Sequence, residues 1–385
     1  MIVAHIITRF IRGGADENTL LCCNAQAERN MTVHLIVGNE INQDMIARLH
    51  PSVSLHIVPQ MVRDIEPLND FTALVGLCRL LSALKPDIVH THTSKAGILG
   101  RVAAIFARHP KIIHGVHILP FLNVGRMKFW LYLGLERMLV RWTHMYVNVS
   151  TGMQVEGIKH RVGCSAQHVV IPSGMDVEKF RRASGYPHAE LLRMIGGDFI
   201  LEGMKVIVMV AALEPRKRIY EFLSVFSALV ERHPNAIFVV LGEGHDAPRI
   251  SARAEQLGLS SRVFLAGFHS DVEKWIASAD VCVLASEREG LPRAVVQYAL
   301  CACPCVVTNL PGVDAVVKHG DTGFLVEPNQ LDKMHDYLDA ILSDPEKADD
   351  MRANAKMLDL SAWGVEHMVS ELEGVYRQVL TRPSI

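Results

Sequence analysis

Short apolar runs rich in β-branched residues alternate with amphipathic stretches along almost the whole chain. The apolar runs predict strands, with helices between most of them, at residues 2–8, 32–37, 53–58, 87–91, 111–116, 145–149 and 168–171. A second series of strands is predicted at residues 205–211, 236–241, 262–266, 280–284 and 304–307. Strands that alternate with helices in this way form parallel sheets, so the predicted fold class is α/β.

An irregular stretch at residues 172–204 separates the two series and carries glycines, prolines and charges with weak periodicity. A chain of 385 residues also exceeds what one hydrophobic core usually holds. We therefore predict two Rossmann-like domains that face each other across a cleft. The first comprises residues 1–185 and takes back a C-terminal helix at about 363–385, and the second comprises residues 186–362.

The composition, 49% hydrophobic and 21% charged, is that of an ordinary globular protein. No apolar run approaches the roughly 18 residues of a membrane-spanning helix, and the start does not resemble a secretory signal, so we expect a cytoplasmic protein. The eight cysteines are then expected to be reduced thiols. A sequence pI near 6.8 and the lack of a basic stripe argue against nucleic-acid binding.

Positive charge is concentrated in the front of the chain. Residues 1–180 hold 18 Lys and Arg against 13 Asp and Glu, which gives +5, and the remaining 21 against 28 give −7. Within this part, residues 125–144 predict a helix in which basic side chains accompany Phe129, Trp130 and Trp142. Such a helix can lie on an anionic bilayer, which would make the protein peripheral on the inner face of the cell membrane. The alternative is an ordinary amphipathic helix packed on a sheet.

The most informative stretch is 281–308, where a buried strand leads through a turn into a helix. Glu289, Gly290, Leu291 and Pro292 form this turn. Unpaired amides at the start of a helix attract an anion such as phosphate, and a carboxylate at the end of a strand accepts hydrogen bonds from sugar hydroxyls. Gln297 lies two helical turns beyond Glu289 on roughly the same face, so both can reach one ligand.

Cations follow the first strand of the second series. Arg216, Lys217 and Arg218 come between that strand and the next helix, where a diphosphate group would need them. Gly242 and Gly244 end the following strand in a similar way. The alternative for the three cations is a solvated run of charges.

Glycines and a histidine mark two strand ends of the first domain. Gly13 and Gly14 stand between a strand and a helix, where glycine lets backbone amides approach a ligand closely. His117 follows the strand at 111–116, at the edge where open α/β sheets present ligand groups. Ordinary turn glycines and a structural histidine are the alternatives.

No metal site is predicted from the cysteines and histidines. Cys301, Cys303 and Cys305 straddle a helix end and a strand, and no second cluster completes a set of four ligands. His90 and His92 alternate on one strand, and we expect them to line a cleft or to pack in the core.

The order and spacing of these motifs resemble the retaining glycosyltransferases of the GT-B type, glycosyltransferase family four, especially bacterial enzymes that build capsule, exopolysaccharide and lipopolysaccharide. The resemblance covers nearly the whole chain. It rests on the Gly-Gly-Ala-Asp turn from Gly13, HTHTSKAGILGRVAA from His90, His117, IPSGMDVEKF from Ile171, EPRKR from Glu214, LGEG from Leu241 and EGLP from Glu289.

The resemblance implies a nucleotide-sugar donor, expected to be UDP-linked, held mainly by the second domain. A saccharide or polyprenyl-diphosphate-linked acceptor would be held mainly by the first. Glu289 would bind hydroxyls of the donor sugar, and Lys217 with Arg216 or Arg218 would neutralise the diphosphate. His117 would contact the transferred sugar. Further donor contacts are expected from Gly13, Gly14, Gly242, Glu243, Gly290, Leu291, Pro292 and Gln297, and acceptor contacts from His92 and Lys95.

No cofactor is expected, and the sequence holds no Asp-x-Asp, the pair with which metal-dependent glycosyltransferases commonly hold a divalent ion. The resemblance therefore implies a metal-independent enzyme. Breaking a glycosyl–phosphate bond develops negative charge on the diphosphate, which cations and helix amides stabilise.

Four positions depart from the family pattern. Gln297 stands in place of the second acid of the E-x7-E signature, and Ala212 stands where relatives place Arg. Ala302 and Ala315 stand where Gly and Glu are usual. These departures leave open a catalytically silent relative that binds nucleotide sugars. A nucleotide-sugar epimerase of the GT-B fold is a second alternative, whereas an NAD oxidoreductase is disfavoured because the first turn lacks G-x-G-x-x-G.

Overall fold

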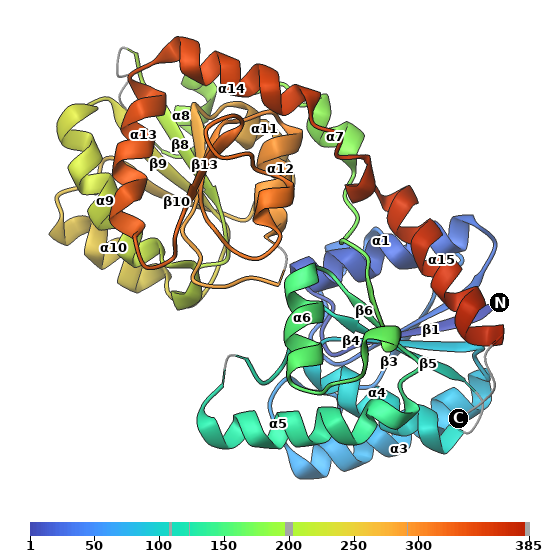
Figure 1. The fold of residues 1–385 in the computed structure, drawn as a ribbon. Coiled ribbons are helices and arrows are strands. Elements are labelled where there is room, and N and C mark those ends of the chain that lie inside the picture. The colour runs from blue at the N-terminus through green and yellow to red at the C-terminus, as the bar shows by residue number, and fades with distance from the viewer. Residues whose placement is uncertain (108–109, 123, 197–202, 291, 382–385) are drawn as a thin grey trace. The chain divides into compact units, whose positions relative to one another are not determined.

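The computed structural model describes residues 1–107, 110–122, 124–196, 203–290 and 292–381. The chain forms two compact units (Figure 1). Unit 1 comprises Met1–Met175 and Ser361–Ile385, and unit 2 comprises Asp176–Leu360. The division falls after Met175, whereas we predicted a boundary at residue 185.

Unit 1 is built on a seven-stranded parallel sheet with the order β3-β2-β1-β4-β5-β6-β7. Its strands are β1 (Ile2–Ile7), β2 (Thr32–Val37), β3 (Ser54–Ile57), β4 (Ile88–His92), β5 (Lys111–Val116), β6 (Met145–Asn148) and β7 (His168–Val170). Its helices are α1 (Gly14–Glu28), α2 (Gln43–Ala47), α3 (Pro67–Leu84), α4 (Ser94–Ala107), α5 (Arg126–Leu139), α6 (Thr151–Lys159) and α15 (Val365–Thr381), with 3₁₀ turns η1 (Val140–Trp142), η2 (Ser165–Gln167) and η6 (Ser361–Trp363).

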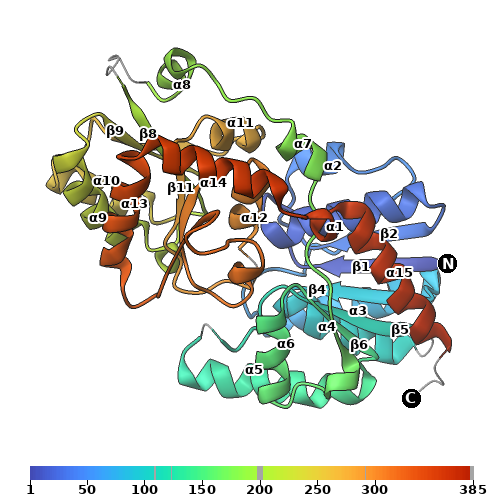
Figure 2. The ribbon, with the colours of Figure 1, turned by 45° about the horizontal axis from the view of Figure 1, so that its top comes forward.

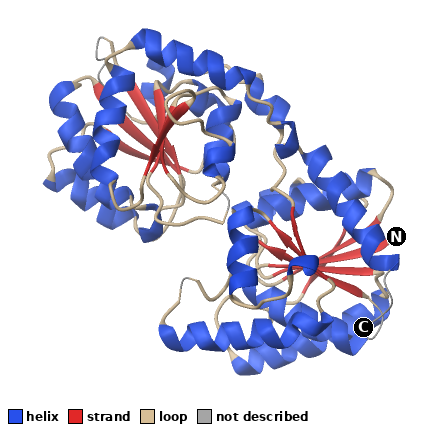
Figure 3. Ribbon diagram, viewed as in Figure 1, coloured by secondary structure: helices blue, strands red, loops and turns tan. Residues whose placement is uncertain are grey.

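Helices cover both faces of this sheet, and the central strands β4, β5 and β6 are accordingly buried on both sides (Figure 3). Val3, Ile88 and Ile113 pack against α1 and α15 on one face. Ala4 and Val89 pack against α3 and α4 on the other face. The C-terminal helix α15 runs beside α1 (Figures 1 and 2). Residues from the two ends of the chain therefore share one core.

Unit 2 repeats the architecture with a six-stranded parallel sheet in the order β10-β9-β8-β11-β12-β13. Its strands are β8 (Lys205–Val210), β9 (Ala236–Leu241), β10 (Val263–Gly267), β11 (Val281–Leu284), β12 (Cys305–Thr308) and β13 (Gly323–Val326). Its helices are α7 (Val177–Arg181), α8 (His188–Met194), α9 (Ile219–Arg232), α10 (Ala247–Gln256), α11 (Val272–Ala277), α12 (Arg293–Leu300), α13 (Met334–Leu342) and α14 (Pro345–Met357), with 3₁₀ turns η3 (Pro215–Lys217), η4 (Val313–Ala315) and η5 (Leu331–Lys333).

The predicted α/β class with two parallel sheets is confirmed. Each predicted strand overlaps an observed one, while β13 was not predicted. The irregular stretch 172–204 was read only as a connection, yet it contains α7 and α8.

Both sheets change direction beside their first strand. In unit 1 the chain moves from β1 to β2 and β3 on one side, then returns to β4 on the other side of β1. In unit 2 it moves from β8 to β9 and β10, then returns to β11 on the other side of β8. Open α/β sheets bind ligands at the carboxyl ends of the strands at such a switch point. A ligand site is therefore expected at the loops after β1, β4, β8 and β11.

Candidate active site

The switch point of unit 2 brings together the two motifs that the sequence singled out. The loop after β8 continues into η3 with Arg216 and Lys217, and the loop after β11 carries Glu289 ahead of α12. Because β8 and β11 are hydrogen-bonded neighbours, these loops leave the sheet side by side. The Glu287 amide donates to the Arg216 carbonyl at 2.9 Å, which ties one loop to the other.

Glu289 is the centre of this site, and its side chain is only 8% exposed. Arg216 Nη1 donates to Glu289 Oε2 at 3.0 Å, and Lys217 Nζ donates to Oε1. The Ser286 hydroxyl also donates to Oε1, at 2.8 Å. Arg216 in turn donates from Nε to the Glu214 carboxylate at 2.7 Å. Two cations and two carboxylates thus form one compensated cluster.

This cluster sets the charge state of Glu289. Burial alone would raise the pKa of the Glu289 carboxyl, but the charges of Lys217 and Arg216 lower it below the usual value of 4.5. Burial likewise lowers the pKa of Arg216, and the carboxylates of Glu289 and Glu214 more than offset it. Glu289 is therefore an ionised acceptor at neutral pH, available to sugar hydroxyls, and Arg216 stays charged.

The loops around the cluster depend on glycine. A Cβ at Gly242 would collide with the carbonyl of Ala211, and one at Gly244 would collide with the carbonyl of Leu213. The Glu243 carbonyl accepts from the Leu213 amide at 2.9 Å, while the Glu243 side chain is exposed. The Leu-Gly-Glu-Gly turn therefore holds the loop after β8 against the end of β9.

The other residues predicted in unit 2 lie near the cluster in the sequence, but the structure gives them other positions and contacts. Arg218 has a left-handed φ of 55° and donates to the Pro328 carbonyl, so it tethers the loop after β13. Gly290 and Pro292 are buried at the start of α12, and Gln297 is half-buried on that helix. Leu291 lies outside the described residues.

At the switch point of unit 1 the polar groups are mostly neutral. Gly13 precedes α1 in an extended conformation, and Gly14 is its first residue. Asp16 in the first turn is buried and accepts from the Ile11 amide at 3.3 Å, and burial raises its pKa to about 7. Thr93 follows β4 with a φ of 60°, which is unusual for a β-branched residue. Its hydroxyl lies 3.2 Å from that of Thr8, at the end of β1.

His117 is the half-buried end of a line of histidines. Its Nε2 lies 3.2 Å from Nδ1 of His92, and Nε2 of His92 lies 2.9 Å from Nδ1 of His5. His92 is 1% exposed, so a direct contact between His92 and an acceptor would require one of these bonds to break. Lys95, the other predicted acceptor residue, pairs with Asp70 at 2.5 Å and donates to the Asp64 carbonyl.

Among the described residues, the ring nitrogens of His5, His90 and His92 form a group that could hold a metal ion, with ligand atoms within 4.8 Å of one another. Both nitrogens of His5 and of His92 already take part in hydrogen bonds. A metal would have to displace those bonds in a fully buried position. We therefore interpret the group as a hydrogen-bonded cluster.

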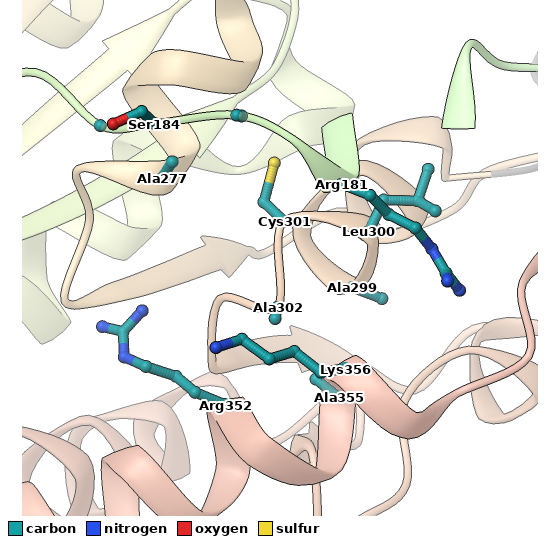
Figure 4. Close-up of a pocket in the computed structure, with 12 residues that line it drawn as sticks. Arg181, Ser184, Ala277, Ala299, Leu300, Cys301, Ala302, Arg352, Ala355 and Lys356 are labelled. Atoms are coloured by element: carbon teal, nitrogen blue, oxygen red, sulfur yellow. The ribbon is translucent and has the colours of Figure 1, made fainter. Parts of the chain in front are cut away.

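A cavity of about 530 Å³ in unit 2 lies away from this chemistry (Figure 4). Its lining includes Cys301 at the end of α12 and Arg352 and Lys356 on α14. These residues surround the segments that precede β11 and β12, at the amino ends of the strands. The carbonyls of Ala279 and Asp280 each accept from Arg352 at 3.0 Å. The switch point, and not this cavity, is the candidate site.

Sequence reasoning did not single out Ser286, Glu214 or Thr93. Ser286 precedes one motif and Glu214 is the first residue of another, but their contacts with the cluster depend on the path of each loop. A buried strand that ends in a short polar segment was the available signal for Ser286. Thr93 had no signal because its conformation is visible only in three dimensions.

Two doubly wound parallel-sheet units, one with a Lys-Arg-Glu cluster at its switch point, define the GT-B class of glycosyltransferases. Family models agree: residues 12–179 match Glycosyltransferase Family 4, and residues 198–357 match glycosyl transferases group 1. The chain belongs to this family, and it is a glycosyltransferase.

Curated relatives of the chain are also glycosyltransferases. The Escherichia coli UDP-Gal:alpha-D-GlcNAc-diphosphoundecaprenol alpha-1,3-galactosyltransferase is 30% identical over 334 residues, which cover 85% of this chain and 84% of that protein. The Staphylococcus aureus capsular polysaccharide biosynthesis glycosyltransferase CapM is 23% identical over 361 residues, covering 92% and 91%.

Solved structures share the fold over the whole length. Anabaena HepE in complex with UDP and glucose has a TM-score of 0.82 at 18% identity, covering 98% of this chain and 100% of that one. WaaG, a glycosyltransferase involved in lipopolysaccharide biosynthesis, has a TM-score of 0.77 at 16% identity, covering 99% and 100%.

Proposed function

We propose that the protein transfers a hexose from a UDP-linked donor to a diphosphate-lipid-linked saccharide, with retention at the anomeric carbon. The observation that carries this proposal is the cluster of Lys217, Arg216 and Glu289 at the switch point of unit 2. The E. coli relative at 30% identity makes UDP-galactose the first donor to test and a polyprenyl-diphosphate-linked N-acetylglucosamine the first acceptor. Retention is what the resemblance to family four implies.

In this reaction the bond between the anomeric carbon and the β-phosphate oxygen breaks. A bond between that carbon and an acceptor hydroxyl oxygen forms, and the hydroxyl proton leaves with the phosphate. Lys217 and Arg216 would stabilise the charge that develops on the diphosphate, helped by the first amides of α12. Glu289 holds both cations in place and, being ionised, can accept hydrogen bonds from hydroxyls of the sugar.

Because these cations can supply the positive charge, we propose that the enzyme needs neither a divalent metal nor another cofactor. Full transfer after exhaustive treatment with EDTA is the expected result. Loss of transfer that Mg²⁺ or Mn²⁺ restores would contradict this part of the proposal.

A catalytically silent relative is the alternative that Gln297, Ala212 and Ala315 favoured. A radiolabelled transfer assay with UDP-galactose and the lipid-linked acceptor separates the two readings. We expect product with the wild-type protein and a loss of roughly 10²–10³-fold in turnover with Glu289→Gln, the range that loss of one preorganised polar group typically costs. Binding of UDP-sugars without any product, across UDP-glucose and the N-acetylated donors as well, would support the silent relative.

The membrane surface is the second part of the proposal. Helix α5 buries Leu133, Glu136 and Leu139, so it packs on the unit as the ordinary amphipathic reading expected. Its opposite side nevertheless exposes large apolar side chains at helical spacing, with basic residues Arg126, Lys128 and Arg141 exposed nearby. These apolar residues are Met127, Trp130, Leu131 and Met138, exposed by 83%, 60%, 50% and 54%.

An exposed apolar stripe flanked by cations fits an anionic bilayer, so we propose that α5 attaches the protein to the inner face of the membrane. Among the described residues, we find no helix whose length and apolar character would let it cross a bilayer. The test is sedimentation with vesicles that contain anionic lipid. Trp130→Ser should release most of the bound protein, whereas Met357→Ser, which changes an 85% exposed methionine of α14, should not. Equal binding of both variants would contradict the attachment through α5.

A further inference from the structure

Unit 1 contains a line of hydrogen-bonded side chains that the proposed reaction does not use directly. It begins at Tyr376 on α15, passes through Gln26 on α1 and then through His5 and His92 on neighbouring strands. It ends at His117, just after β5. The four residues before His117 are at most 1% exposed, in a face of the sheet that is otherwise apolar.

The distances make this line continuous. Gln26 Oε1 lies 2.9 Å from Nε2 of His5, Nδ1 of His5 lies 2.9 Å from Nε2 of His92, and Nδ1 of His92 lies 3.2 Å from Nε2 of His117. At the inner end, Gln26 Nε2 donates to the Tyr376 hydroxyl at 3.3 Å. That hydroxyl lies 2.7 Å from Nδ1 of His90.

The position of Gly115 shows how tightly the line is fitted. A Cβ at residue 115 would lie 2.9 Å from Nδ1 of His92 and 3.2 Å from Nε2 of His90. A side chain there would push the two rings apart. The strand β5 therefore has glycine where the histidines of β4 need the space.

The histidines inside the line are neutral. Burial lowers the pKa of His5 to about 4. Burial also lowers the pKa of His92 well below its usual value, and the neighbouring histidines lower it further. The hydrogen bonds of His5, His90 and His92 reach only Gln26, Tyr376 and other histidines, with no carboxylate among their partners. A neutral imidazole has one donor and one acceptor nitrogen, so each bond fixes the direction of the next.

The direction follows from the Gln26 amide. Its carbonyl oxygen can only accept, so His5 carries its hydrogen on Nε2 and accepts with Nδ1. His92 must then donate from Nε2 and accept with Nδ1, which requires His117 to donate from its own Nε2. We propose that Gln26, His5 and His92 are positioning residues that hold His117 in one orientation as the Nε2–H tautomer. The basic nitrogen of His117 is then Nδ1.

The tautomer matters because it decides what His117 offers to a ligand. A neutral His117 with its hydrogen on Nε2 can accept a hydrogen bond from a sugar hydroxyl at Nδ1, whereas the opposite tautomer would donate there. A buried partner that holds an imidazole in one tautomer can be worth several orders of magnitude in rate, as in serine proteases. This consequence for the reaction rests on the proposed function, but the tautomer itself does not.

The experiment reads the tautomer directly in the unliganded protein. Protein labelled with ¹⁵N in the histidine rings is examined by multiple-bond ¹H–¹⁵N correlation, and the His117 signals are assigned by their loss in His117→Gln. In the wild type we expect the Nε2–H tautomer. Gln26→Met removes the acceptor of the His5 Nε2–H and should populate the Nδ1–H tautomer of His117.

Two controls keep the result interpretable. Cys23→Ala changes a fully buried side chain of the same helix without touching the line and should keep the wild-type spectrum. Tyr376→Phe removes the hydroxyl that orients Gln26 and should give a mixture of both tautomers. A wild-type His117 with its hydrogen on Nδ1, or an unchanged tautomer in Gln26→Met, would overturn the proposal.

Steady-state kinetics test whether the tautomer of His117 affects sugar transfer. We expect at least about a tenfold lower kcat/KM with an altered pH profile in Gln26→Met, and near wild-type values in Cys23→Ala. If the expected tautomers are observed but no variant, wild type included, transfers sugar, then the proposed function fails and the positioning role stands. Equal kcat/KM and pH profiles in Gln26→Met and the wild type would refute the link to the reaction.

Discussion

The two units share an architecture, but their switch points differ in charge. In unit 2, two cations and two carboxylates meet between β8 and β11, and Glu289 stays ionised because Lys217 and Arg216 lie against it. In unit 1, the corresponding place between β1 and β4 holds threonines and neutral histidines, together with Asp16, whose pKa is raised to about 7, and the ion pair of Lys95 with Asp70. A charged cluster suits a diphosphate, and neutral donors and acceptors suit sugar hydroxyls. The same fold can therefore serve both halves of one transfer reaction through different residues at the same topological position.

The largest expected effect is on the free energy of unfolding. It distinguishes the ion pair of Arg101 with Glu136, which holds the fold, from the ion pair of Lys217 with Glu289, which belongs to the candidate site. Arg101 on α4 and Glu136 on α5 pair at 2.7 Å with side chains only 1% and 2% exposed. Arg101→Met leaves the Glu136 carboxylate buried without its partner, so we expect a loss of about 3–5 kcal/mol in the free energy of unfolding. Urea denaturation measures this loss.

The double variant Arg101→Met/Glu136→Leu should recover most of that stability, because both buried charges are then gone. Lys217→Ala leaves Glu289 paired with Arg216, so it should cost less, about 1–2 kcal/mol. An equal loss from Arg101→Met and Lys217→Ala would erase the distinction between the two pairs.

The second effect concerns transfer. Lys217→Ala should lower kcat by roughly 10²–10³-fold, since it removes a cation aimed at the charge that develops on the leaving group. Lys205→Ala is the matched control, because Lys205 is at the opposite end of β8 and pairs with Asp280 at 3.6 Å. Comparable losses in the two variants would show that lysines of unit 2 act through stability and not through the site.

Acid should affect the two switch points in different pH ranges. His5 has a folded-state pKa of about 4 against 6.5 when unfolded, so only the unfolded chain takes up its proton between these values. The buried histidines should therefore weaken unit 1 as the pH drops below 6.5, by about 2 kcal/mol at pH 5 from His5 alone, with His90 and His92 adding to this loss. Asp16 acts in the opposite direction, because its pKa is raised to about 7 and the folded state takes up its proton first. Glu289 has a lowered pKa, so its contribution to unit 2 is present above 4.5 and is lost only at more acidic pH.

Hydrogen exchange at pH 7 and pH 5, corrected for intrinsic rates, measures this difference peptide by peptide. Peptides from β1 and β4 should lose protection at pH 5, while those from β8 and β11 should keep it. Equal loss in both sheets would contradict the contrast between a neutral and a charged switch point.

The smallest effect concerns a departure from the family pattern. Ala302 has a left-handed φ of 52° and is 6% exposed, and Ala299 has the same exposure within α12. In Ala302→Gly, relief of the backbone should roughly offset the lost methyl group, so stability should stay within about 0.5 kcal/mol of the wild type. Ala299→Gly has no such relief and should cost about 1–2 kcal/mol. Chemical denaturation of both variants tests this, and equal costs would contradict it.

Local pattern was sufficient for most of the fold. Alternation of apolar runs and amphipathic stretches located the strands from β1 to β12, because buried parallel strands read as continuous apolar segments. The strand β13, Gly323–Val326, was missed because it begins with glycine and lies between a glycine-containing turn and a proline.

The candidate site was predictable only in part. Glu289 and Lys217 were found because each follows a strand, and the strand order then brings them together. The line from Gln26 through His5 to His117 was not found, because it joins residues from one helix, two strands and the segment after β5 that are distant in the chain. His92 was expected at the acceptor, yet its burial follows from the covering by α1 and α15, which local sequence does not reveal.

The most direct test of the charged site is calorimetric binding of UDP and UMP to the wild type and to Lys217→Ala. If Lys217 grips the diphosphate, the wild type should prefer UDP over UMP, and Lys217→Ala should weaken UDP binding by roughly 10–100-fold while leaving UMP binding nearly unchanged. An undiminished preference for UDP in Lys217→Ala would contradict the account.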